Sequence, residues 1–209
     1  MLCRICETRR PRRYCPAVQG EICPVCCGRE REVSLNCPLD CEYLQEARKH
    51  ERPRELKNED FPNRDIRITE QFLRDREELI AFMSRSLLDA GLETAGAVDS
   101  DALAAVQALI RTYRTLQSGL VYETRPVSPM AAAIYDRMQS AVQEYRREIA
   151  EESGIASLRD AEVLGVLVFL ERMEIQQANS RPRGRAFLDH LRSFFPSEPA
   201  REPGPLIQQ

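Results

Sequence analysis

The spacing of apolar residues predicts helices along most of the chain. In the segments that follow Thr69 and Asp99, apolar side chains recur every three or four positions, which places them on one face of an α-helix. Thr69 is suited to cap the first of these helices, which we expect to end before Gly91. Asp99 or Ser100 opens the second helix, which we expect to end before Gly119. The two segments are therefore predicted as consecutive amphipathic helices.

Three further helices follow from the same pattern. The Ser128–Pro129 pair begins one of them, because the first turn of a helix tolerates proline, and Gly154 ends it. The segment from Ser157 to Asp160 resembles a capping box and introduces an almost wholly apolar helix over residues 163–173. Such a helix is expected at the centre of a bundle rather than at its surface. A short amphipathic helix over residues 185–195 follows.

These elements predict a mainly α fold, with a small N-terminal cysteine-rich zinc module followed by an antiparallel four- to five-helix bundle. We expect the module over residues 1–51, a linker over 52–66, the bundle over 67–195 and a disordered tail over 196–209. Apolar residues make up 43% of the 209 positions and charged residues 30%, as is typical of a soluble globular protein. The sequence shows no signal peptide and no apolar run long enough for a membrane, so we expect a cytoplasmic location.

All eight cysteines lie within the segment from Cys3 to Cys41. In the cytoplasm thiols stay reduced, and clustered cysteines there more often bind metal than form disulfides. The pairs Cys3-x-x-Cys6 and Cys23-x-x-Cys26 have the spacing with which two thiolates grip one tetrahedral ion from a tight turn. The sequence therefore predicts zinc, and the number of thiols predicts two ions.

The adjacent residues Cys26 and Cys27 guide the assignment of ligands. Neighbouring side chains usually diverge, so we expect these two cysteines to bind different ions. The first predicted site is Cys3, Cys6, Cys23 and Cys26, and the second is Cys15, Cys27, Cys37 and Cys41. An assignment that exchanges Cys23 with Cys27 has compatible spacing. Four thiolates leave no open coordination position, so we expect both ions to be structural rather than catalytic.

The opening of the chain resembles a known zinc-finger type. Cys3-x-x-Cys6, followed by Arg13-Tyr14-Cys15-Pro16 and a further cysteine cluster, is similar to the start of the HIT and MYND cross-brace zinc fingers. The resemblance covers residues 3–41, and the Cys26–Cys27 doublet departs from it. It implies two interleaved zinc ions and a role as a protein-interaction module.

Two arginine clusters are candidates for nucleic-acid contact. The first cluster is Arg9, Arg10, Arg12 and Arg13, with Tyr14 beside it, and the second is Arg181, Arg183 and Arg185. Arginines bind phosphates, and an exposed tyrosine can stack on a base. We expect both clusters on loops, where they cooperate only if the zinc module folds back onto the bundle. The alternative is that the arginines of the first cluster neutralise the nearby thiolates.

Taken together, the sequence predicts a non-enzymatic zinc protein that acts as a protein-interaction or adaptor module. No glycine-rich phosphate loop, paired Glu-x-x-His motif or nucleophile–histidine–acid combination is evident. Two alternatives remain open: an RNA- or DNA-binding accessory protein that uses the arginine clusters, and a thiol-based redox or metal sensor. We expect another protein as the partner, or else RNA or DNA, and no membrane. The oligomeric state does not follow from the sequence.

Overall fold

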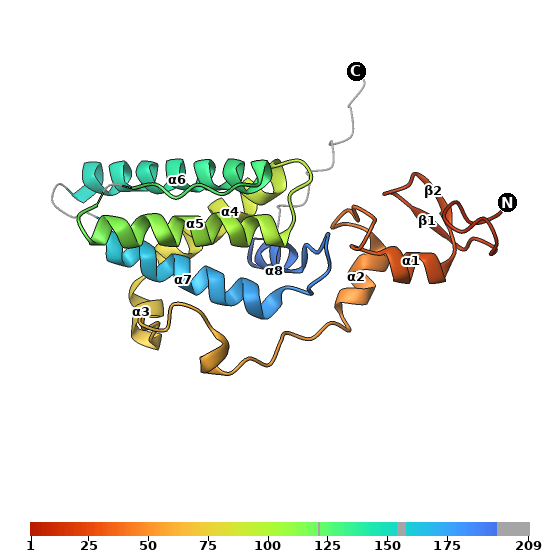
Figure 1. Cartoon of the computed structure of the whole chain (residues 1–209), viewed down its shortest axis with the longest axis horizontal. Coiled ribbons are helices and arrows are strands. Elements are labelled where there is room, and N and C mark those ends of the chain that lie inside the picture. Colours follow the sequence, from red (N-terminus) through yellow and green to blue (C-terminus); the bar gives the residue numbers. More distant parts are fainter. Residues whose placement is uncertain (121, 154–157, 196–209) are drawn as a thin grey trace, which may run out of the picture.

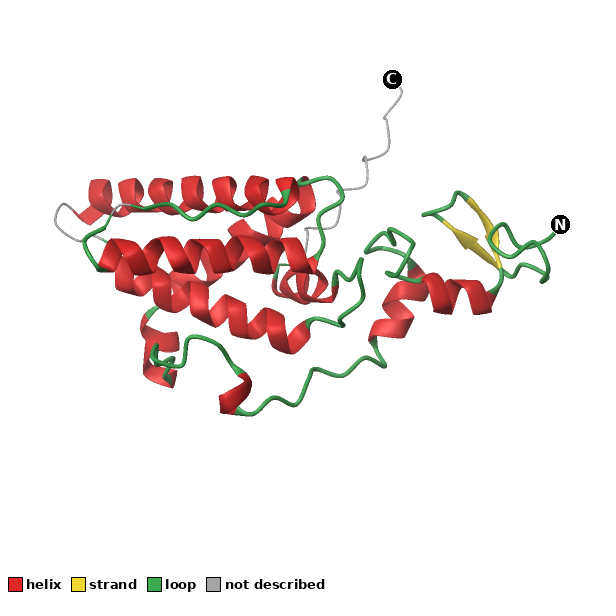
Figure 2. Cartoon of the chain, in the orientation of Figure 1, coloured by secondary structure: helices red, strands yellow, loops and turns green. Residues whose placement is uncertain are grey.

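A computed structural model of the chain describes residues 1–120, 122–153 and 158–195. The described part is mainly helical, with a small cysteine-bearing head at one end and a bundle of long helices at the other (Figures 1 and 2). The elements are β1 (Arg13–Cys15), β2 (Gly20–Ile22), α1 (Pro24–Glu30), α2 (Glu42–Arg48), the 3-10 helix η1 (Asn58–Asp60), α3 (Glu70–Asp75), α4 (Glu77–Glu93), α5 (Asp99–Gln117), α6 (Pro129–Ser153), α7 (Asp160–Gln177) and α8 (Ala186–Phe194). The predicted fold class is confirmed.

The long helices α4, α5, α6 and α7 pack together, with the short α8 lying across one end of the bundle (Figure 1). Helix α5 makes its most extensive contacts with α7 and α6, because its buried face is lined with alanine and larger apolar residues. The predicted starts at Asp99 and at Pro129 are both observed. No helix in the described ranges is long and apolar enough to cross a membrane.

The helix predicted after Thr69 is in fact two helices. The Thr69 hydroxyl does cap a helix, accepting a hydrogen bond from the Phe72 N–H at 3.1 Å, but this helix is the short α3, which ends at Asp75. The predicted end before Gly91 is also wrong, because α4 continues through Gly91 to Glu93. A Cβ atom at Gly91 would lie 2.7 Å from a methyl carbon of Leu188. This glycine therefore allows α8 to approach α4 closely and does not end the helix.

Helix α7 occupies the centre of the bundle, as its apolar composition predicts. Its residues from Val163 to Val168 are all buried, and a Cβ atom at Gly165 would lie 2.5 Å from the ring of Phe72 on α3. At the start of α7, the Arg159 N–H donates to the Glu162 carboxylate at 3.0 Å. The expected cap residue Ser157, and the expected end of α6 at Gly154, lie outside the described residues.

The head is built from a two-stranded antiparallel hairpin and two short helices. Strand β1 pairs with β2 in the register Arg13 with Ile22 and Cys15 with Gly20. Besides cysteines, the buried apolar side chains of the head are Ile22, Leu39 and Leu44. This is too little apolar surface to hold such a segment together unaided.

The segment predicted as a linker, residues 52–66, lies along the bundle. The Arg54 N–H donates to the Gln176 carbonyl at 2.9 Å, and Asn63 donates to the buried Glu171 carboxylate at 2.6 Å. The Arg172 guanidinium in turn donates to the backbone carbonyls of Asn63 and Ile66. These bonds hold the connection between head and bundle against α7. The tail expected over residues 196–209 lies outside the described residues.

Candidate metal centre

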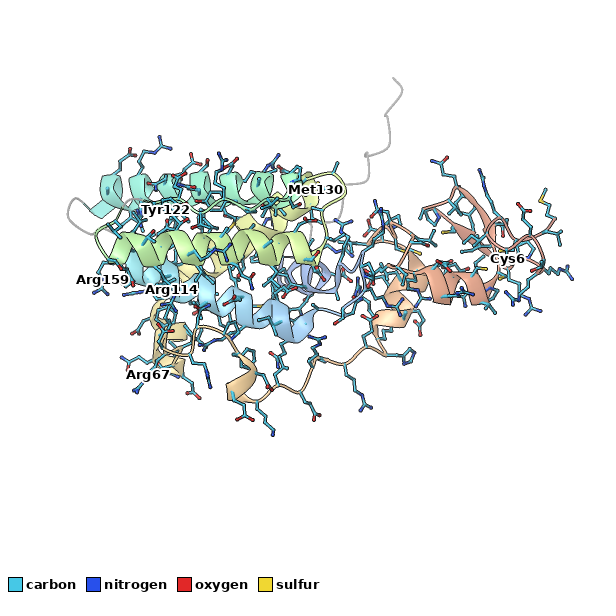
Figure 3. All side chains as sticks on the ribbon, viewed as in Figure 1. Cys6, Arg67, Arg114, Tyr122, Met130 and Arg159 are labelled. Atoms are coloured by element: carbon cyan, nitrogen blue, oxygen red, sulfur yellow. The ribbon has the colours of Figure 1, made fainter. Side chains whose placement is uncertain are left out.

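Four cysteines of the head converge on one point. The sulfur atoms of Cys3, Cys6, Cys23 and Cys26 all lie within 4.8 Å of one another. Cys3 and Cys6 come from the N-terminal turn, whereas Cys23 caps α1 and Cys26 lies in its first turn. Figure 3 shows Cys6 in the part of the head that is remote from the bundle. The described cysteines form no disulfide, so all four thiols are available as ligands.

Backbone N–H groups point at these sulfurs. The Cys23 N–H donates to the Cys3 sulfur at 3.2 Å, and the Cys26 N–H donates to the Cys23 sulfur at 3.4 Å. Hydrogen bonds from the Thr8 hydroxyl and from the N–H groups of Thr8 and Arg9 lower the pKa of Cys6 to about 5. Such donors favour the thiolate, which is the form that binds metal.

Burial and the neighbouring thiols oppose the ionisation of some thiols in this group. Burial opposes the ionisation of Cys3, yet hydrogen bonds from the N–H groups of Cys6 and Cys23 lower its pKa. Burial raises the pKa of Cys26 to about 12, and the adjoining thiols of Cys23 and Cys6 add to this rise. Ionisation of all four thiols is therefore unfavourable without a cation. A bound divalent ion removes this conflict by neutralising the charge.

The four sulfurs fit a tetrahedral metal ion. With a zinc–sulfur bond of about 2.3 Å, the sulfurs of a tetrahedral site lie about 3.8 Å apart. The observed separations of at most 4.8 Å require shifts of about 1 Å or less at each sulfur, within the reach of cysteine rotamers. The group contains Cys23 and not Cys27, which agrees with the first of the two assignments compatible with the sequence. The head thus has a site able to hold a metal ion.

The other four cysteines are arranged differently. Cys15 ends β1 and Cys27 lies in α1, while Cys37 is in the following loop and Cys41 caps α2. Among the residues that the structure describes, only the first four cysteines form a group of potential ligands within 4.8 Å of one another. Burial raises the pKa of Cys37, and charges on Glu32, Cys15 and Cys41 add to the rise. The second site stays a prediction.

Arginines of the head donate hydrogen bonds to cysteine sulfurs. The guanidinium groups of Arg13 and Arg31 donate to the Cys27 sulfur at 3.5 and 3.8 Å. A hydrogen bond to Cys23 raises the pKa of Arg9. These contacts favour the alternative in which arginines of the first cluster neutralise thiolates.

The structure separates Tyr14 from the arginine beside it. Arg13 lies in strand β1 rather than in a loop, and alternation along the strand places Tyr14 on the opposite face, where it is exposed. The aromatic partner of Arg13 is Tyr43 of α2, whose ring centre lies 4.4 Å from the guanidinium carbon. Arg10 and Arg12 are exposed.

The second arginine cluster lies against the head. Arg181 donates through its guanidinium to the Arg31 carbonyl at 2.6 Å, and the Arg183 N–H donates to the Glu32 carbonyl at 2.8 Å. The Arg183 side chain is exposed, whereas burial at this junction lowers the pKa of Arg185. Arg13, Arg31, Tyr43 and Arg181 line one cavity of about 410 Å³. Arg13 and Arg181 are thus brought together, as expected for a head that folds back onto the bundle.

Glu32 is the centre of the junction and was missed by sequence reasoning. This fully buried glutamate accepts hydrogen bonds from Arg48 at 2.7 Å, from the Asn179 side chain at 2.8 Å and from the Arg185 N–H at 2.9 Å. Its backbone has a positive φ of 51°, which costs energy for a residue other than glycine. Only its position in a polar loop two residues after α1 hinted at such a role.

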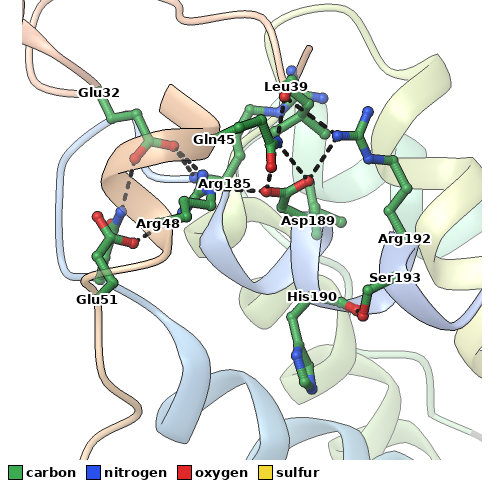
Figure 4. Close-up of polar contacts among 12 residues, drawn as sticks. Glu32, Leu39, Gln45, Arg48, Glu51, Arg185, Asp189, His190, Arg192 and Ser193 are labelled. Atoms are coloured by element: carbon green, nitrogen blue, oxygen red, sulfur yellow. Dashed lines mark hydrogen bonds and ion pairs between the residues drawn. The ribbon is translucent and has the colours of Figure 1, made fainter. Parts of the chain in front are cut away.

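Arg48 extends this network to α8 (Figure 4). Its guanidinium pairs with Glu32, with Glu51 at 3.2 Å and with Asp189 at 2.8 Å. Asp189 also accepts a hydrogen bond from Gln45 of α2 and pairs with Arg192. Charges from the head and from α8 therefore alternate across the junction, and each of the carboxylates of Glu32, Glu51 and Asp189 pairs with a cation.

A second buried acid supports α8 from within the bundle. The two carboxylate oxygens of Asp99 accept hydrogen bonds from the N–H groups of Phe187 and Leu188, at 2.9 and 3.1 Å. These N–H groups lie in the first turn of α8, where a helix leaves donors without partners. Burial nevertheless raises the pKa of Asp99 to about 6. Asp99 thus caps α8 from the start of α5.

Comparison of the chain with models of known protein families, with curated proteins and with solved structures gives no match. The function is therefore inferred from the chain's own residues.

Proposed function

We propose that the chain is a non-enzymatic zinc protein whose metal-fixed head serves as a protein-interaction or adaptor module. The observation that carries the proposal is the convergence of Cys3, Cys6, Cys23 and Cys26. Four thiolates in a closed tetrahedral arrangement are typical of structural zinc, which leaves no position open for a substrate. Zinc supplies the folding free energy that so small an apolar core lacks.

We assign a second zinc ion to Cys15, Cys27, Cys37 and Cys41. The guanidinium groups of Arg13 and Arg31 donate to the Cys27 sulfur, and burial keeps Cys15 and Cys37 from water. This ion would join the hairpin and α1 to the start of α2. The head would then be interleaved, since Cys15 of the second site lies in the sequence between the two cysteine pairs of the first.

The surface of the head supports a binding role. Large apolar side chains that do not contribute to its core are exposed there, namely Leu2, Tyr14, Val25 and Val33. A head held by metal does not need these residues for its own folding, and exposed apolar side chains are a common feature of protein-binding surfaces. Meanwhile the polar junction around Glu32 holds the head on the bundle, as an adaptor requires.

The first experiment is the metal content of protein purified under reducing conditions. Two zinc ions per chain support both sites, and one ion supports only the first site, which includes Cys3. Protein without zinc, with its cysteines in disulfides, would contradict the proposal.

The second experiment tests the adaptor role by identifying proteins that co-purify with the zinc-loaded chain. A specific partner should be lost from the Val25→Glu variant and retained by Val127→Glu, which changes a fully exposed residue of the bundle. If both variants recover the same amount of partner, the surface around Val25 does not bind the partner.

Nucleic-acid binding remains the second candidate, and one observation favours it. Arg13 and Arg181, from the two clusters, line the same cavity. Material that co-purifies and is sensitive to ribonuclease would support this function over the adaptor role.

A further inference from the structure

Three guanidinium groups meet in the cavity between the head and the bundle. Arg13 comes from β1, Arg31 follows α1, and Arg181 comes from the turn before α8. Across the described ranges no carboxylate pairs with any of the three. A guanidinium group has five N–H donors, and the bonds to the Cys27 sulfur and to the Arg31 carbonyl use only part of them, so the other donors are available to a ligand.

Existing contacts hold these arginines in place. Arg13 and Arg31 both donate to the Cys27 sulfur, and Arg181 donates to the Arg31 carbonyl. Arg13 also lies over the ring of Tyr43. Little side-chain entropy is then lost when a ligand binds, which increases affinity.

The acidic residues of the cavity do not neutralise the arginines. Glu46 and Glu51 line it too, but each has another cation: Glu46 pairs with Lys49 at 2.7 Å, and Glu51 pairs with Arg48 at 3.2 Å. These carboxylates do repel a second or third phosphate. The cavity thus suits one compact anionic group better than a continuous nucleic-acid backbone.

Guanidinium groups match the geometry of phosphate oxygens, and a phosphate monoester carries close to two negative charges at neutral pH. The Arg13 guanidinium lies over the Tyr43 ring, and aromatic rings and guanidinium planes are the groups on which nucleobases stack. A volume of about 410 Å³ is in the range of small-molecule sites. We propose that this cavity binds a nucleoside monophosphate, as a free nucleotide or as the 5′-phosphorylated end of a nucleic-acid strand.

The test is calorimetric titration of the zinc-loaded full chain with adenosine 5′-monophosphate and with adenosine. We expect the monophosphate to bind about ten- to a hundredfold more tightly than adenosine, because charge-assisted hydrogen bonds to phosphate supply the difference. Arg13→Gln and Arg181→Gln should each weaken monophosphate binding about tenfold or more. Equal binding of the two ligands would overturn the proposal.

Matched controls lie beside the two arginines. Arg12 and Arg183 are exposed and do not line the cavity, so Arg12→Gln and Arg183→Gln should bind as the unchanged protein does. If these controls lose as much affinity as the cavity variants, binding reflects general charge and the proposal fails. Arg181→Lys serves as a control for misfolding. It keeps the positive charge but lacks the paired N–H donors of the guanidinium, so its affinity for the monophosphate should lie between those of the unchanged protein and Arg181→Gln.

The source of the phosphate is decided with short RNA strands. Tighter binding of a 5′-phosphorylated strand than of the monophosphate assigns the site to strand ends, and the reverse assigns it to free nucleotides. Binding of phosphoserine peptide as tight as that of the monophosphate would show a protein ligand and overturn the assignment. None of these outcomes depends on the adaptor role, which is tested separately at Val25.

Discussion

The head and the bundle reach a folded state by different means. In the bundle, a continuous cluster of apolar side chains from α4 to α8 is buried, including Met83, Leu109, Met138 and Leu167. In the head, cysteines make up most of the buried side chains, and the apolar residues are few. Hydrophobic burial therefore accounts for the bundle, whereas for the head we propose that ligation of its thiols supplies the folding free energy that its small apolar core lacks. The junction between them is polar and is centred on one carboxylate.

The strongest way to test this contrast is to remove a thiol. Cys26→Ser should release the metal and unfold the head, because a structural zinc site contributes on the order of 10 kcal/mol to folding. The bundle should keep its helices. Zinc content and amide hydrogen exchange, measured on the same sample, check both halves of this prediction. Loss of helicity throughout the chain would show instead that head and bundle form one cooperative unit.

The reverse experiment weakens the bundle. Leu167 is fully buried at the centre of α7, so Leu167→Ala should lower the free energy of unfolding by about 2 to 5 kcal/mol, through lost transfer energy and the cavity left behind. Zinc content should not change. Denaturant unfolding measures the loss, and Leu92→Ala, at a residue 40% exposed, serves as the control with a much smaller effect. An equal effect of the two variants would argue against the central position of α7.

A change at the junction tests whether the two regions depend on each other. Glu32→Gln keeps the shape of the side chain but removes the charge that Arg48 and Asn179 contact. We expect a loss of about 1 to 3 kcal/mol, because charged hydrogen bonds are replaced by neutral ones. Faster amide exchange in residues 179–185, with zinc retained, would locate the effect at the junction. Glu46→Gln, on an exposed pair with Lys49, should leave stability nearly unchanged, because solvent screens exposed ion pairs.

The smallest effect concerns pH and the bundle alone. Burial raises the pKa of Glu174 to about 8, and the charge of Asp99 adds to the rise. The folded carboxyl thus binds its proton more tightly than the unfolded one, whose pKa is near 4.5, so stability falls as pH rises between these values. Glu174→Gln should remove most of this decline, because the amide does not titrate. Thermal unfolding at pH 5 and pH 8 measures it, and the exposed Glu148→Gln should keep the full decline.

Much of the fold could be predicted because local signals decide it. The Ser128–Pro129 pair and the Thr69 hydroxyl act within one helical turn, so their effect can be found in the sequence. The role of Gly91 could not, because it depends on Leu188, nearly a hundred residues away. The break at Arg76 likewise lacks the proline or glycine that usually marks one.

The candidate site also has features that local sequence predicts and features that depend on distant residues. The pairs that begin at Cys3 and at Cys23 have a spacing that predicts metal binding, and these four cysteines do converge. The partners of Glu32 and of Asp99 come from distant segments, and a lone acid in the sequence does not reveal them. For the same reason the pairing of Arg13 with Tyr43, rather than with Tyr14, required the structure.

The junction at Glu32 also has a consequence for how the chain is made. Asn179 and Arg185 lie 147 and 153 residues after Glu32. At about 5 to 20 residues per second, the ribosome delivers them roughly 7 to 30 seconds later. During this interval the Glu32 carboxylate lacks both partners, whereas every cysteine of the proposed metal sites has already been synthesised. On the proposed function, ligation by the cysteines can therefore precede docking, and a polypeptide released before residue 179 lacks the segment that docks at Glu32.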